Sequence, residues 1–148
     1  MQNARMVERF RPILAAPVLR WVALLGLCAA YLQGGFDRAA EFSDAIAEMN
    51  HFGLSPAAPL ASVTIVVDIV ASILILAGVY RWLGALALAS FTFFATFVAN
   101  RSWEMARVER FTGTNLFLEH LGLVGGFLLV AWYDFRERSH ASDPSSTP

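Results

Sequence analysis

Asp68 is the residue in this sequence that most clearly points to chemistry, because it lies near the centre of an otherwise uncharged apolar stretch, 57–79. An aspartate at the centre of a membrane helix costs roughly 2.5–3.5 kcal/mol on insertion scales. Thr64 and Ser72 lie one helical turn on either side of it, so the three polar side chains share one face. That face is expected to pack against other helices rather than lipid. Burial favours the neutral acid, so we expect Asp68 to be protonated at pH 7.

A second set of polar residues clusters near the ends of the apolar stretches. Asn115 and Glu119 share one helical face, and His120 follows directly. Two interpretations stay open: a water-accessible pocket opening outward with Asp68 at its floor, or a ring of capping residues at the membrane interface. In the second, Asp68 only hydrogen-bonds a neighbouring helix. The candidate pocket residues are Gln33, Arg38, Asp68, Asn100, Asn115, Glu119 and His120.

The inventory of reactive side chains is thin. His120 is the one histidine inside an apolar stretch, whereas haem held by two histidines needs a pair, and zinc needs more imidazole or thiolate ligands. Cys28 has no cysteine partner within the chain, and the glycine-rich nucleotide motifs are absent. We therefore expect no catalytic residue, no metal site and no bound cofactor, which favours a protein that is not an enzyme. Quinone stays open as a ligand, because a phenylalanine cluster could line such a site or simply pack: Phe91, Phe93, Phe94 and Phe97.

Four apolar stretches must position these residues, and they lie at about 13–36, 57–79, 83–100 and 115–133. A bilayer core of about 30 Å needs about 20 helical residues. A soluble helix would show a polar face at every turn, and these stretches do not. The predicted fold is all-α: a four-transmembrane-helix bundle with a short amphipathic interfacial helix between spans one and two, within 37–52. Residues 13–135 would form one membrane domain, after a cytoplasmic segment 1–12 and before a disordered tail 136–148.

The arginines predict the orientation of the bundle. Seven of them lie on the side of the two termini and of the Arg81 turn, and four lie on the other side. Because basic residues are enriched in cytoplasmic loops, both termini are expected in the cytoplasm and the connection 37–55 outside. The net charge of −1 argues against nucleic acid as a partner, and the lipid bilayer is the expected one.

Several short segments, taken in order over about 14–133, resemble the DoxX family of bacterial four-helix membrane proteins. They are Gly35-Phe36-Asp37-Arg38 after span one, Gly53-Leu54-Ser55-Pro56 before span two, the turn Gly78-Val79-Tyr80-Arg81, and 115–126 in span four. Asp68 falls where the family often has Glu, and Glu119-His120 replaces its common Lys-Asn. The resemblance implies a multi-pass bacterial inner-membrane protein. It does not imply one reaction, because members are linked variously to quinol or thiosulfate oxidation and to membrane redox complexes.

Two functions follow as hypotheses. The first is a non-catalytic accessory or assembly subunit of a membrane oxidoreductase or respiratory complex, with the other redox subunits as its partners. The second is a quinone-binding or proton-coupled small-molecule membrane protein that uses Asp68 and the outer polar pocket. The sequence leaves open whether the chain also forms a homo-oligomer.

Overall fold

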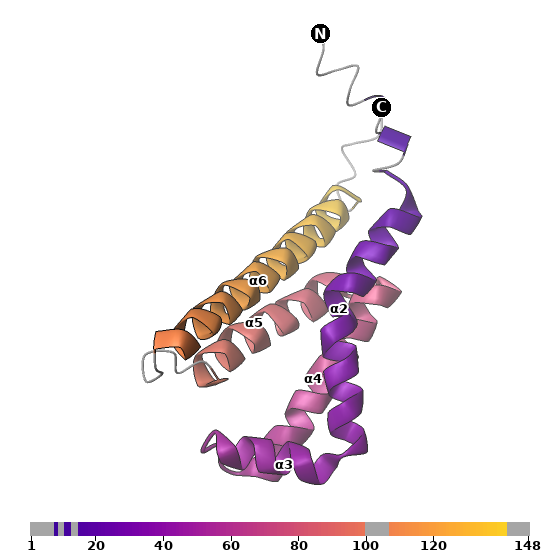
Figure 1. Cartoon of the computed structure of the whole chain (residues 1–148). Coiled ribbons are helices and arrows are strands. Elements are labelled where there is room, and N and C mark those ends of the chain that lie inside the picture. The colour runs from indigo at the N-terminus through magenta and orange to yellow at the C-terminus, as the bar shows by residue number, and fades with distance from the viewer. Residues whose placement is uncertain (1–7, 9–10, 13–14, 100–106, 142–148) are drawn as a thin grey trace.

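The computed structural model describes residues 8, 11–12, 15–99 and 107–141, and this part of the chain is helical and contains no strand (Figure 1). Four helices are long and apolar enough to cross a membrane, which confirms the predicted all-α membrane fold. The helices of the structure are α2 (Pro17–Ala40), α3 (Phe42–His51), α4 (Ala57–Ala77), α5 (Arg81–Ala99) and α6 (Arg107–Ala141).

The helices end at different residues from the apolar stretches. Helix α2 begins at Pro17, where proline fits the first turn, and continues past the apolar stretch to Ala40. The predicted interfacial helix is the shorter α3. Helix α6 begins at Arg107 and runs to Ala141, so residues 136–141 of the predicted tail are helical. At 1.5 Å per residue its 35 residues measure about 52 Å, more than a bilayer core.

The helices pack in chain order, with α2 on α4, α4 on α5, α5 on α6, and α3 across the end of α4 (Figure 1). The main core contains Cys28, Ile75, Leu88 and Phe127, which are fully buried. A Cβ added at Gly84 would lie 2.6 Å from the Ala71 carbonyl oxygen, so glycine is what lets α5 approach the α4 backbone. Small residues at such contacts are typical of membrane helices, which gain little from the hydrophobic effect on association.

One end of the bundle is joined by ion pairs around Asp134 of α6, a buried acid. Its Oδ2 accepts a hydrogen bond from the Trp82 amide at 3.1 Å and another from Arg138 Nε at 3.0 Å. Arg81 lies 3.8 Å from Oδ1, and Arg138 also donates to the Gly78 carbonyl oxygen. Asp134 thus satisfies an amide at the start of α5 and joins the α4–α5 turn to α6. We call this the turn end and the opposite end the α3 end.

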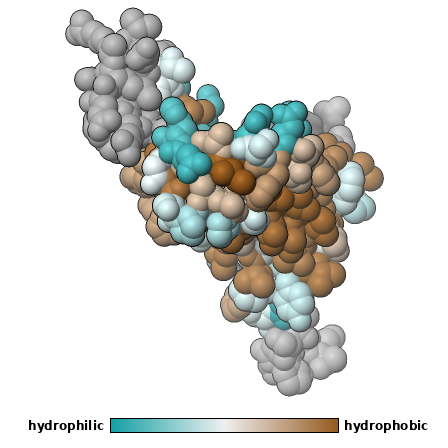
Figure 2. All heavy atoms as spheres, turned by 90° about the horizontal axis from the view of Figure 1, so that it is seen from below, coloured by the Kyte–Doolittle hydropathy of each residue, from teal (hydrophilic) through white to brown (hydrophobic). Residues whose placement is uncertain are grey.

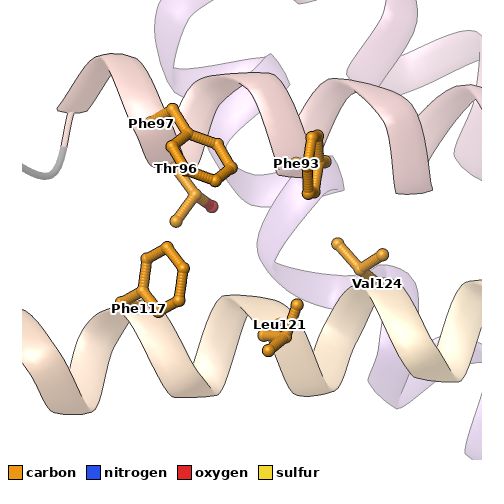
Figure 3. Close-up of a pocket in the computed structure, with 6 residues that line it drawn as sticks. All are labelled: Phe93, Thr96, Phe97, Phe117, Leu121 and Val124. Atoms are coloured by element: carbon orange, nitrogen blue, oxygen red, sulfur yellow. The ribbon is translucent and has the colours of Figure 1, made fainter.

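At the α3 end, α5 and α6 meet through aromatic side chains (Figure 3). Phe97 packs edge-to-face on Phe93 and on Phe117. Between these rings and Leu121 lies a gap of about 10 Å³, too small for a quinone. Phe93 and Phe97 of the predicted phenylalanine cluster therefore pack against α6 and do not line a quinone-sized site.

The outer surface of the four long helices is apolar. Seen from the α3 end, hydrophilic residues gather in limited patches beside a broad brown apolar surface (Figure 2). Large exposed apolar side chains come from each long helix, and among them are Val22, Val66, Phe94 and Leu129. A surface of this kind suits lipid rather than water.

Candidate ligand-binding site

A cavity of about 730 Å³ lies toward the α3 end and is lined by residues of α2, α3, α4, α5 and α6. Its volume lies within the range of small-molecule sites, about 300–1,000 Å³. The wall is mainly apolar and aromatic, and its members include Met49, Phe52, Leu60, Val63, Phe91, Phe94, Val98 and Leu123. The polar residues on the wall are Tyr31, Arg38, Glu48, Thr64, Asp68, Thr92, Thr96 and His120.

Three charged side chains from three helices meet at this cavity. Arg38 of α2 binds Glu48 of α3 through Nε at 3.0 Å and Nη2 at 3.3 Å. Its remaining terminal nitrogen, Nη1, lies 3.4 Å from Oδ2 of Asp68 in α4. Gly35, one turn before Arg38, has no side chain to hold the helices apart, and a Cβ there would lie 2.8 Å from Ile69 Cγ1. The close approach of α2 and α4 is what brings Arg38 to Asp68.

Asp68 is almost completely buried, with 1% of its surface exposed. Its Oδ1 has no hydrogen-bond partner among the described residues, although a buried carboxylate oxygen normally has one. From the sequence alone we expected a neutral acid with no cation at this depth. The structure places the Arg38 guanidinium 3.4 Å from Asp68 Oδ2, a contact that this expectation did not include.

The wall that α2 and α5 share carries a second polar group. The Tyr31 hydroxyl and Thr92 Oγ1 lie 2.6 Å apart, and Thr92 also donates to the Leu88 carbonyl oxygen. Thr96 donates to the Thr92 carbonyl oxygen one turn along. These hydroxyls are paired within the protein, so Asp68 Oδ1 stands out as the buried acceptor that lacks a partner on the cavity wall.

The structure brings some of the predicted site residues together and separates others. Arg38, Asp68 and half-buried His120 all line the cavity. Gln33, Asn115 and Glu119 are exposed and do not line it. Asn100 lies outside the described residues. On the same helix, a Cβ added at Gly126 would lie 3.3 Å from Leu27 of α2, whereas one added at Gly122 would meet nothing within 4 Å.

Sequence reasoning missed four polar residues of the wall: Glu48, Tyr31, Thr92 and Thr96. Glu48 lies on the polar side of the amphipathic α3, and its proximity in sequence to Arg38 was the available signal. Tyr31 and Thr92 lie inside apolar stretches, where a hydroxyl is tolerated in any orientation. Within the described residues, no three His, Cys, Asp or Glu side chains gather as a metal site would need.

Comparison with known proteins identifies a family for the chain. The family model described as DoxX matches residues 18–101, more than half of the 148-residue chain. The match covers α2 to α5 and ends before α6. No curated protein and no solved structure matches the chain.

Proposed function

Because the chain belongs to the DoxX family and spans the membrane several times, we propose that it binds a small amphipathic molecule, such as a quinone, in the cavity at the α3 end. The supporting observation is the mixed wall of this cavity. An apolar, aromatic lining suits the body of such a ligand, and the Arg38–Glu48–Asp68 group suits its polar head.

The position of the cavity fits a ligand that arrives through the lipid. Val63 and Phe94 line it and are also strongly exposed, at 58% and 68%. The wall therefore continues onto surface that would face acyl chains. An amphiphile dissolved in the bilayer would reach the charged group without first crossing water.

The distribution of arginines also supports an orientation and a location for the protein. The sequence places seven arginines on the turn-end side and four on the α3 side. We infer a bacterial cytoplasmic membrane, with both termini in the cytoplasm and the α3 end outward. The ligand would then bind in the outer half of the bilayer.

Photolabelling tests the proposal with a matched pair of variants. The protein in nanodiscs is irradiated with a photoreactive, alkyne-tagged quinone analogue, and labelled peptides are mapped by mass spectrometry. Labels should concentrate on cavity residues, and Ala30→Trp should strongly reduce them, because Ala30 lines the cavity. Ala29→Trp, one residue along and exposed, should leave them unchanged. Labelling spread evenly over the lipid-facing surface would refute the site.

An accessory role in a membrane oxidoreductase complex is the second candidate. It is favoured by the length of α6, whose charged end carries exposed Arg136 and Glu137. Such a helix end could contact a cytoplasmic or membrane partner. Purification in mild detergent tests it: a redox subunit recovered at equal stoichiometry, and lost after Arg136→Glu, would support the role. Recovery of the chain alone under conditions that keep respiratory complexes intact would contradict it.

A further inference from the structure

We propose that the cavity selects a lipophilic cation, an amphiphile whose head is a protonated amine, with Asp68 as its counter-ion. This inference rests on the proposed amphiphile site and specifies which head the site prefers. Arg38 makes unequal contacts with its two acidic neighbours, Glu48 and Asp68.

The charged group at the cavity has one positive and two negative side chains. Glu48 takes two of the three guanidinium nitrogens, at 3.0 and 3.3 Å, whereas Asp68 has a single contact at 3.4 Å. Arg38 therefore pairs mainly with Glu48, and with all three side chains ionised the group carries a net charge of −1 centred near Asp68. A buried negative charge that is not fully compensated favours a ligand that carries a positive charge.

Asp68 Oδ1 adds a buried acceptor that lacks a donor among the described residues, although Asp68 lies on the cavity wall. A protonated amine supplies both an N–H donor and a positive charge. A hydroxyl supplies the donor alone, and a carboxylate or phosphate head would place a second negative charge against the first.

The surroundings of the cavity also favour a cation. The end of α2 and helix α3 carry the acids Asp37, Glu41 and Asp44 in addition to Glu48, against the single Arg38 and His51. Acids gathered at one end raise the local concentration of cations. Inside, Phe52, Phe91 and Phe94 line the cavity, and aromatic side chains of this kind suit both a cation and the apolar body of the ligand that carries it.

The test compares three probes that share one body: 4-phenylbutylamine, 4-phenylbutanol and 4-phenylbutyrate. Binding is measured by titration calorimetry in nanodiscs of phosphatidylcholine, with empty nanodiscs subtracted. Wild type should bind the amine about tenfold more tightly than the alcohol, and the carboxylate most weakly. Asp68→Asn should abolish the difference between amine and alcohol. Glu137→Gln, which removes an exposed acid from the turn end, should preserve it.

Glu48→Gln provides an independent variant if Asp68→Asn does not fold. It frees the Arg38 guanidinium for Asp68, which neutralises the group, so the amine preference should fall as it does in Asp68→Asn. An amine preference that survives both substitutions would overturn the proposal.

The outcomes separate this inference from the proposed function. If all three probes bind equally and Ala30→Trp blocks each of them, the amphiphile site stands and the cation preference is wrong. If no probe binds while the quinone analogue still labels the cavity, the cation preference alone is again wrong. If neither binding nor labelling occurs, both proposals fail.

Discussion

The Arg38 guanidinium contacts two acids, Glu48 on the surface helix α3 and Asp68 inside the bundle. The pair with Glu48 is partly exposed, and exposed pairs contribute little to stability. The contact with Asp68 differs, because only 2% of the Asp68 side chain is exposed. At that depth the Arg38–Asp68 attraction itself adds little net stability. Loss of Arg38 would be costly because it would leave the buried Asp68 charge without a counter-ion.

Replacement of Arg38 by Met should therefore destabilise the protein by about 3 kcal/mol. The substitution leaves the buried Asp68 carboxylate without its counter-ion. Adding Asp68→Asn to the Arg38→Met variant should therefore restore most of the stability. The free energy of unfolding is measured by titration with dodecyl sulfate in mixed micelles. Arg20→Met is the control, since it breaks an exposed pair with Glu137 and should cost less than about 1 kcal/mol.

An Asp68→Asn substitution that brings no rescue, together with an Arg38→Met variant as stable as wild type, would show that Asp68 is a neutral acid. That result would reinstate the interpretation drawn from the sequence alone.

At the scale of helices, the contact between α4 and α5 depends on Gly84. The Ala71 carbonyl oxygen, Leu74 and Ile75 all lie within 3.2 Å of the place that a Cβ would occupy there. The nearest of these is a backbone atom of a packed helix, which cannot move aside as a flexible side chain can.

We expect Gly84→Ala to lower the free energy of unfolding by about 1–3 kcal/mol, because the helices must separate. Gly125→Ala is the matched control on α6, where an added Cβ meets nothing within 4 Å. It should be neutral or slightly stabilising, since alanine favours a helix over glycine. The same dodecyl sulfate titration measures both, and equal losses would show that backbone propensity rather than contact sets the effect.

The sequence predicted the spans well because a run of about 20 apolar residues is sufficient to identify one. It predicted the ends of α4 and α5 to within two residues but those of α2 and α6 poorly, since a helix can continue beyond its apolar stretch through polar residues such as Asp37 and Arg38.

Site residues on α6 were harder to predict because they depend on how the helix is rotated. His120 precedes the buried Phe127 by seven residues, almost two full turns, so the two point the same way. Glu119 is turned away by about 100° and reaches the surface. Only tertiary packing sets that rotation, and only α3 packing onto α4 brings Glu48 to Arg38.

The whole molecule is joined tightly at the turn end and hollow at the α3 end, and its two ends should face opposite sides of the membrane. We expect an impermeant thiol reagent on intact cells to label Ala47→Cys and not Ser142→Cys, both placed in a Cys28→Ala background. Ala47 is exposed on α3, whereas its neighbour Ala45 is buried and would give a false negative. After permeabilisation both should react. Labelling of position 142 alone in intact cells would reverse the orientation and leave the fold intact.

The hydrogen bond and ion pair that join Asp134 to the start of α5 can form only late in biosynthesis. Ribosomes make the chain from its N-terminus, so Arg81 and the Trp82 amide enter the membrane region before their acidic partner on α6 has been translated. Until then Arg81 at the α4–α5 turn lacks its carboxylate partner and has the Ile75 carbonyl oxygen as an acceptor. Chains stalled before residue 134 should therefore be degraded faster by membrane quality-control proteases than chains stalled after α6, a difference that pulse-chase labelling can measure.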